Sequence, residues 1–184
     1  MAEIIARRAI LAATLGLFLC GVGFVVTASA EPGNDNRAPD LGDCGDLAVP
    51  AGHKVTFYAY AEGVQIYGWN GMAWVFQGPE AVLYAGAEDD DVVGTHYAGP
   101  TWESNSGSSV VGAVVERCTP NPDAIPWLLL AAVDSDGPGV LDGVTYIQRV
   151  NTVGGLAPSE PGEFPGDVAR VPYAADYFFY RQHK

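Results

Sequence analysis

The chain has 184 residues, with 9 lysines and arginines against 22 aspartates and glutamates, a formal net charge of −13. An excess of acidic residues this large repels nucleic acid and anionic lipid headgroups, so we expect neither as a partner. The length suits a single domain with a buried core.

The first 30 residues have the order of a secretory signal peptide. Arg7 and Arg8 precede an apolar run over residues 9–26, and Ala28-Ser29-Ala30 has the small-x-small pattern of a cleavage site. We expect cleavage after Ala30; the alternative is a retained anchor, since the run approaches spanning length. Cleavage leaves 7 basic and 21 acidic residues in a secreted or extracytoplasmic protein, and we expect no stable membrane insertion afterwards.

The segment after the cleavage site is rich in Pro, Gly, Asn and Asp. Residues 31–43 have almost no apolar side chains, so we expect a flexible leader before a domain over residues 44–184. Two cysteines remain, Cys44 and Cys118. In an oxidising compartment an even pair is typical of a disulfide, and neither cysteine lies in a CxxC motif.

From residue 47 onward the hydrophobic pattern has a period of two, which is typical of β-strands. In residues 53–61 one face carries Val55, Phe57, Ala59 and Ala61. Further strands are predicted over residues 81–85, 101–104, 109–117, 125–133, 144–151 and 171–180. Short strands with Gly- and Pro-rich turns predict an all-β fold, a single antiparallel β-sandwich or a barrel-like domain. The Pro- and Gly-rich loop over residues 154–169 is expected to cross a sheet edge.

Residues 64–77 (VQIYGWNGMAWVFQ) predict a β-hairpin, because Asn-Gly is the preferred two-residue turn. With Asn70-Gly71 as the loop, Trp69 faces Met72 and Tyr67 faces Trp74. One face of the hairpin is then aromatic. Such a face packs in the core, meets a ligand or meets a partner.

The stretch from Gly94 to Glu103 (GTHYAGPTWE) gathers polar and aromatic side chains around a Gly-Pro corner. We expect the turn to bring His96 close to Glu103, or to Gln148 or Arg149 of the polar strand further along. A His-carboxylate pair can carry out acid-base or metal chemistry, or it can simply satisfy buried polar groups. We interpret the stretch as an architectural corner, anchored by Trp102, that also lines the most ligand-like concavity of the domain.

Six ordered motifs resemble the secreted bacterial and fungal family known as domain of unknown function 3455. They are GVQIY (63–67), W-x-F with a following PEA (74–81), GTHYAGPTWE (94–103), IPWLLL (125–130), YIQRVNTVGG-x-AP (146–158) and VPY-x-A-x-Y-x-FY (171–180). The resemblance covers the chain from about residue 47 to residue 180. It implies an exported, β-rich domain and brings no established activity, so no catalytic residue is transferred.

Two classes of function remain. The first is a non-enzymatic extracellular binding module for a carbohydrate or another small cell-envelope ligand; the candidate ligand-binding residues are His96, Tyr97, Trp102, Glu103, Arg149, Trp69 and Trp74. The second is a hydrolase or metal-assisted enzyme centred on His96 and Glu103, with Arg149 as an anion clamp. GxSxG and HExxH motifs are absent from the sequence, and we assign no catalytic residue, metal or cofactor. The binding module is the favoured interpretation.

Overall fold

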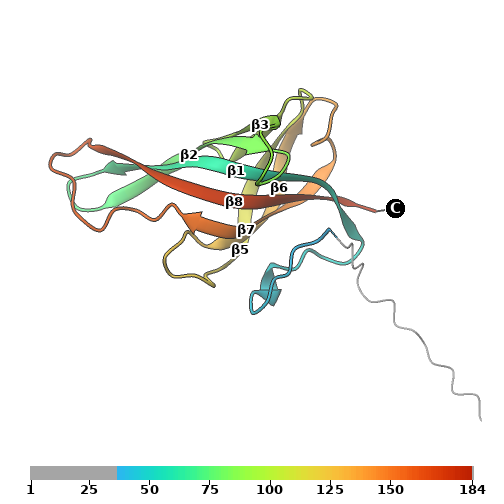
Figure 1. The fold of residues 1–184 in the computed structure, drawn as a ribbon, viewed down its shortest axis with the longest axis horizontal. Helices are drawn as coiled ribbons and strands as arrows, with labels where there is room; N and C mark the ends of the chain where they lie inside the picture. Colours follow the sequence, from blue (N-terminus) through green and yellow to red (C-terminus); the bar gives the residue numbers. More distant parts are fainter. Residues whose placement is uncertain (1–36, 184) are drawn as a thin grey trace, which may run out of the picture. The chain divides into compact units, whose positions relative to one another are not determined.

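The computed structural model describes residues 37–183, which form one antiparallel sheet closed into a barrel (Figure 1). Each strand pairs with the next one along the chain, and the last pairs with the first. The elements are a short 3-10 helix η1 (Gly45–Leu47) and the strands β1 (His53–Trp69), β2 (Trp74–Tyr84), β3 (Val92–Tyr97), β4 (Thr101–Ser104), β5 (Ser109–Cys118), β6 (Trp127–Asp136), β7 (Val144–Gly154) and β8 (Val168–Gln182). The predicted all-β fold is confirmed, in its barrel form.

The predicted signal peptide and residues 31–36 of the predicted leader lie outside the described residues. Within residues 37–183 there is no helix of the length and hydrophobicity needed to cross a membrane.

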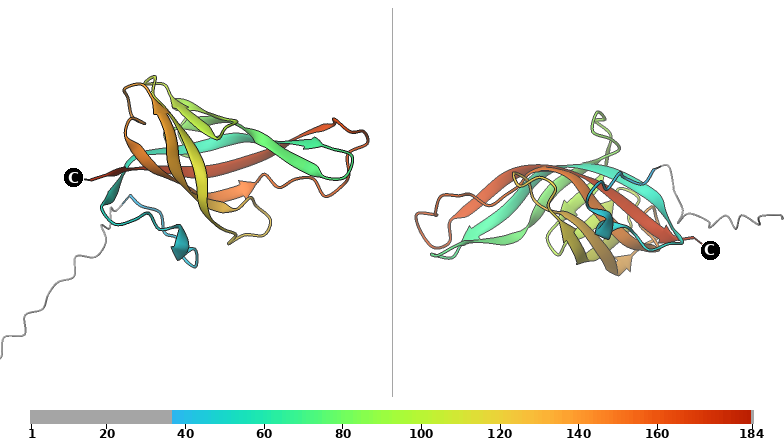
Figure 2. Two further views of the ribbon diagram at one scale, coloured as in Figure 1. Left: turned by 180° about the vertical axis from the view of Figure 1, so that it is seen from behind. Right: turned by 90° about the horizontal axis from the view of Figure 1, so that it is seen from below.

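Strands β1 and β8 are longer than the pattern predicted. They pair from His53 opposite Gln182 to Gly68 opposite Val168, and with β2 they run on past the shorter strands as a long arm (Figures 1 and 2). The predicted strand over residues 53–61 and the first arm of the predicted hairpin are therefore one strand. Gly63 makes this continuity possible, because a Cβ atom there would come within 2.2 Å of the Glu80 carbonyl oxygen on β2.

The hairpin at the tip of this arm has a four-residue loop where two residues were predicted. Trp69 pairs with Trp74, and the Asn70 side-chain oxygen accepts hydrogen bonds from the N–H groups of Met72 and Ala73, each at 2.9 Å. The predicted register is therefore wrong by two residues next to the loop, and it shifts once more between Ile66 and Tyr67. Because side chains alternate with a period of two, the two-residue shift leaves residues 67–69 and 74–76 on their predicted faces. The predicted aromatic face is present, and the rings of Trp69 and Trp74 lie 5.4 Å apart.

The barrel interior combines small side chains on β1 with large ones on other strands. Ala59 and Ala61 are fully buried in the same core cluster as the bulky rings of Trp102, Tyr177 and Phe179. Side chains of this kind, small on one strand and large on others, fill the interior of a small barrel.

One end of the barrel is closed by the connection between β6 and β7. Leu141 from this connection is fully buried, and its N–H donates to the Ser108 hydroxyl at 3.0 Å. The neighbouring Val140 N–H donates to the Ser106 hydroxyl at 3.1 Å. The turn between β4 and β5 therefore holds the β6–β7 connection, residues 137–143, in this end of the barrel. We call this connection the plug.

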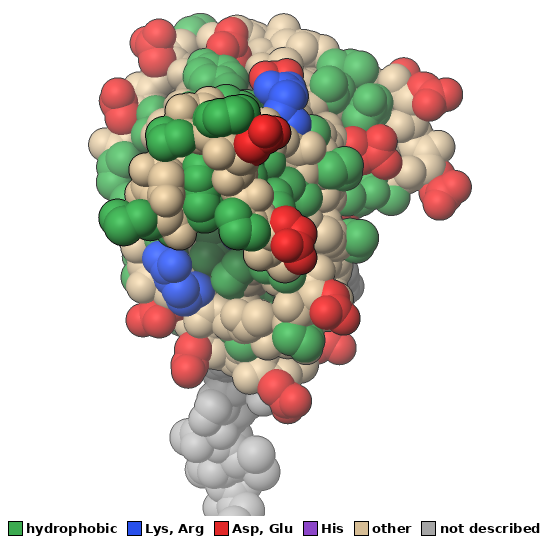
Figure 3. Space-filling model, turned by 90° about the vertical axis from the view of Figure 1, so that its left-hand side faces the viewer, with side chains coloured by type: hydrophobic (Ala, Val, Ile, Leu, Met, Phe, Trp, Pro, Cys, Tyr) green, Lys and Arg blue, Asp and Glu red, His purple; other side chains and the backbone are tan. Residues whose placement is uncertain are grey.

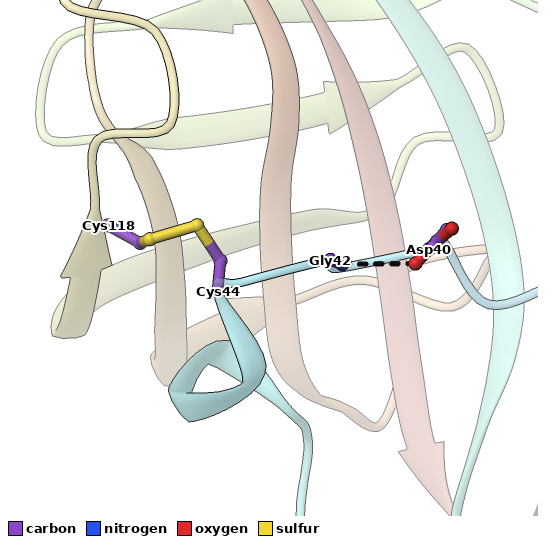
Figure 4. The surroundings of a disulfide bond; sticks show 4 residues. All are labelled: Asp40, Gly42, Cys44 and Cys118. Carbon is purple, nitrogen blue, oxygen red and sulfur yellow. Dashed lines mark hydrogen bonds between the residues drawn. A yellow bond between two sulfur atoms is a disulfide. The ribbon is translucent and has the colours of Figure 1, made fainter.

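A second apolar cluster lies on the outer surface of the sheet and is stapled by the predicted disulfide. Cys44 is bonded to Cys118, at the end of β5 (Figure 4). Leu47 of η1 is fully buried in the same cluster as Leu129 of β6. Gln148 of β7 donates to the Leu47 carbonyl at 2.6 Å. These contacts fasten the N-terminal segment to the outside of β5, β6 and β7.

Candidate functional site

The end of the barrel opposite the plug contains a pocket of about 510 Å³. This end carries the connections β1–β2, β3–β4, β5–β6 and β7–β8, and all eight strands contribute to the pocket wall. The face on the arm side of the molecule is hollowed, with mostly hydrophobic side chains around the hollow (Figure 3). The pocket volume lies in the range of small-molecule sites.

The corner between β3 and β4 supplies an aromatic stack to this pocket. His96 pairs with Trp102 across the two strands, and both side chains are buried inside the barrel. Their rings are stacked with centroids 4.3 Å apart and planes inclined by 7°, and the Tyr177 ring meets His96 edge-on at 5.2 Å. Burial of Trp102 agrees with the predicted anchor of the corner.

The ionisation state of His96 follows from its contacts. Its Nδ1 lies 2.8 Å from the Thr101 carbonyl oxygen, which can only accept, so Nδ1 carries the proton and Nε2 is an acceptor. Burial lowers the pKa of His96 to about 3; the Thr101 hydrogen bond opposes this shift and the nearby charge of Arg149 adds to it. His96 is therefore neutral at neutral pH.

Glu103 lies on the other side of the sheet. It pairs with Thr95, so its side chain points away from the barrel interior, and its carboxylate accepts a hydrogen bond from the Tyr97 hydroxyl at 3.0 Å. That hydrogen bond raises the pKa of Tyr97. The expected contact of His96 with Glu103 is wrong, because the alternation of β4 places them on opposite faces. No group of three or more His, Cys, Asp or Glu side chains in the described part of the chain is placed to hold a metal ion.

Arg149 of β7 brings a positive charge to the pocket wall. Its Nε and Nη2 donate to the Pro126 carbonyl at 3.2 and 2.8 Å, which fixes the guanidinium. Arg149 is half-buried, yet it forms no ion pair with any described residue. Its charge lowers the pKa of Tyr177 against the larger, opposite effect of burial. Neither Arg149 nor Gln148 is the hydrogen-bond partner of His96 that the sequence suggested.

Several buried polar atoms around the pocket have no hydrogen-bond partner among the described residues. They are Gln65 Nε2, Trp102 Nε1 and the Tyr177 hydroxyl in the wall, and the Tyr173 hydroxyl close by. The pKa of each tyrosine is raised, first of all by burial. The Tyr177 hydroxyl lies near Tyr173 and Arg149, but no pair among them reaches hydrogen-bond geometry. Leaving such a group unpaired costs about 1–3 kcal/mol.

Gly155, after β7, lets Gln65 and Tyr173 come together. It has a φ of +80°, and a Cβ atom there would lie 2.9 Å from Tyr173 Cβ and 3.1 Å from Gln65 Cγ. Its carbonyl accepts from the Tyr67 hydroxyl at 2.7 Å, and its N–H donates to the Pro172 carbonyl at 2.9 Å. A glycine at this bend therefore positions part of the pocket wall.

Gln65, Tyr173 and Tyr177 were not among the residues predicted for the site. One sequence feature could have identified Gln65. It is a polar residue at a position of a predicted strand where the alternating pattern places a side chain inside the fold, as in Gly63-Val64-Gln65-Ile66-Tyr67.

Trp69 and Trp74, which the sequence suggested as ligand contacts, hold a loop instead of lining the pocket. The Trp74 indole N–H donates to the Glu160 carbonyl at 2.8 Å, and Gly162 lies against the Trp69 ring. The Trp69 backbone N–H donates to the Asp167 carbonyl at 2.8 Å. The β7–β8 loop thus runs along the hairpin.

Residues 50–181 match the model of a family described as "Protein of unknown function (DUF3455)". The chain belongs to this family. No curated protein and no solved structure matches it. The six motifs that carry the resemblance to DUF3455 converge in space, since each contributes residues to the pocket wall; examples are Gln65, Phe76, His96, Leu128, Arg149 and Tyr177. The pocket is the feature that these separate stretches share.

Proposed function

We propose that this DUF3455 protein binds a small molecule in the pocket at the open end of its barrel. The observation that carries the proposal is the set of unpaired donors in the pocket wall, Gln65 Nε2, Trp102 Nε1 and the Tyr177 hydroxyl. These residues are at most 2% exposed. Polar groups buried so deeply are nearly always hydrogen-bonded in folded proteins. A ligand that fills the pocket would supply the partners.

A binding role is favoured over hydrolysis by the chemistry of the wall. The pocket is lined by no Ser, Cys, Lys, Asp or Glu from the part of the chain that the structure describes. The Nδ1–H of His96 donates a hydrogen bond to the Thr101 carbonyl, so no carboxylate orients the ring as a general base. The second hypothesis, an enzyme centred on His96 and Glu103, lacks the contact that it requires.

The predicted ligand-binding residues divide into two groups. His96, Trp102 and Arg149 line the pocket, and we propose them as ligand contacts. Tyr97, Glu103, Trp69 and Trp74 lie outside its wall: Tyr97 and Glu103 are hydrogen-bonded to each other on the outer face, and the two tryptophans hold the loop. A glycan held on the tryptophan hairpin is therefore less well supported than a small molecule inside the barrel.

We also propose that the protein works outside the cytoplasm. Two features support this location: the signal-peptide order of residues 1–30 and the bond between Cys44 and Cys118. Sequencing the N-terminus of the exported protein tests it. A mature chain that begins at Glu31 is expected; an intact N-terminus on a membrane-bound protein would contradict the cleavage, and an unprocessed chain found only in the cytoplasm would contradict the location.

A fluorescence titration with the neutral apolar dye 1-aminoanthracene tests the binding proposal. Val114 lines the pocket and is 40% exposed, so Val114→Trp should narrow the pocket without disturbing the core. Val115 is 51% exposed and lies outside the wall, so Val115→Trp is the matched control. We expect saturable binding that weakens at least tenfold in the first variant and persists in the second.

Two results would contradict the proposal: absence of saturable binding, or equal binding by the two variants. A melting curve gives an independent measurement. A ligand at 100 times its Kd stabilises the folded state by about 2.7 kcal/mol. For a domain of this size that raises Tm by about 5–10 °C.

A further inference from the structure

The pocket wall also indicates the charge of the ligand. We propose that the pocket takes an organic anion, a molecule with an apolar body and a carboxylate or similar single anionic head. This inference rests on the proposed binding function and adds to it the chemical class of the ligand.

The first observation is the charge of the wall. Arg117 and Arg149 line the pocket, while no acidic residue of the described part, residues 37–183, does, although acidic residues outnumber basic ones in the whole sequence by 22 to 9. The wall therefore has the opposite charge to the chain as a whole. A low-dielectric pocket strengthens the attraction of such charges for an anion.

The second observation is the type of the unpaired atoms. Gln65 Nε2 and Trp102 Nε1 can only donate a hydrogen bond, and the Tyr177 hydroxyl can donate one. A carboxylate has two oxygens that only accept, so it complements a set of donors. A ligand rich in its own donors would leave these groups unpaired.

The third observation is the position of Arg149. The two hydrogen bonds to Pro126 fix its guanidinium, and further N–H groups remain for a ligand. Arg149 pairs with Tyr177 across β7 and β8, so the two side chains leave the sheet side by side and on the same face. An arginine held in this way is suited to a two-point contact with a carboxylate. Its charge has no partner among the described residues, and an anionic head would neutralise it.

The rest of the wall fits an apolar body. Phe76, Leu128 and Leu130 contribute hydrophobic surface, and the stacked rings of His96 and Trp102 contribute an aromatic wall. The volume of about 510 Å³ accommodates one or two fused rings with a short polar group.

A matched pair of compounds tests the inference. 2-Naphthoate and 2-naphthamide share their ring system and differ in charge. Calorimetric titration of the purified protein with each compound, at pH 7.5 and low salt, therefore measures how much the anionic head contributes to affinity. We expect the carboxylate to bind at least tenfold more tightly than the amide. Arg149→Gln should remove this preference, and Arg149→Lys should retain part of it. Arg170→Gln is the control, because Arg170 is exposed and pairs with Glu80 outside the pocket.

Equal or tighter binding of the amide would overturn the inference, and so would a carboxylate preference that Arg149→Gln leaves unchanged. If Arg149→Gln does not fold, as circular dichroism would show, the two compounds on the unaltered protein decide the question alone. Failure of both compounds beside normal 1-aminoanthracene binding overturns the anionic class and leaves the proposed function standing. Loss of dye binding as well overturns both.

Discussion

Acidification below about pH 6.5 should destabilise this protein through His96. Burial lowers the pKa of His96 to about 3 in the folded state, whereas an unfolded histidine titrates near 6.5. Between these values the unfolded state binds a proton that the folded state does not. The free energy of unfolding therefore falls as the pH drops below about 6.5, by up to about 1.4 kcal/mol per pH unit. From pH 7 to pH 5 the loss amounts to about 2 kcal/mol.

The assay is urea unfolding at several pH values between 7.5 and 5, on the parent protein and on His96→Asn. The asparagine amide can still donate to the Thr101 carbonyl but does not titrate. This variant should be less stable at pH 7.5, because the stack on Trp102 is lost, and its stability should depend less steeply on pH. His183→Asn, at an exposed position near the C-terminus, should keep the parent's slope. Equal slopes for the parent and His96→Asn would refute the reasoning.

Three further outcomes are expected. Replacing Cys44 and Cys118 by serine opens a loop with a sequence separation of 74, which should lower the unfolding free energy by about 4 kcal/mol; a loss below about 1 kcal/mol in urea titration would contradict this. Gly63→Ala forces a Cβ atom against β2 and should lower the free energy of unfolding by about 1–3 kcal/mol. Gly45→Ala, which meets nothing within 4 Å, should change little, and similar melting curves for the two glycine variants would count against the packing described for β1. Glu103→Ala should alter stability by less than about 0.5 kcal/mol, since its carboxylate is exposed; a large drop in Tm would show a role that the structure does not assign.

Local alternation predicted a good part of the fold. The inward face of β1 was readable because Val55, Phe57, Ala59 and Ala61 alternate with polar residues, and period-two faces survive a two-residue error in register. The sequence did not allow a choice between a sandwich and a barrel. It depends on the pairing of β1 with β8, whose paired residues are a hundred or more positions apart in the sequence.

The site was predicted only in part, because proximity in the corner was judged without the strand register. The three residues 98–100 form the turn, so Tyr97 pairs with Thr101, and this register sends Glu103 outward while His96 and Trp102 point inward. Gln65 and Tyr177 were not predicted as site residues, for another reason. Whether an inward polar atom has a partner depends on strands distant in the sequence, and no local pattern contains that information.

The indole N–H signals of the tryptophans, in a ¹⁵N-edited NMR spectrum, test the central claim most directly. The Trp102 N–H has no partner in the described structure, whereas the Trp74 N–H already donates to the Glu160 carbonyl. Trp102→Phe and Trp74→Phe assign the two signals. If a ligand occupies the pocket and pairs with its wall, saturating 2-naphthoate should move the Trp102 signal strongly and leave the Trp74 signal in place. Once calorimetric titration shows that 2-naphthoate binds, an unmoved Trp102 signal, or a change confined to Trp74, would contradict binding inside the barrel.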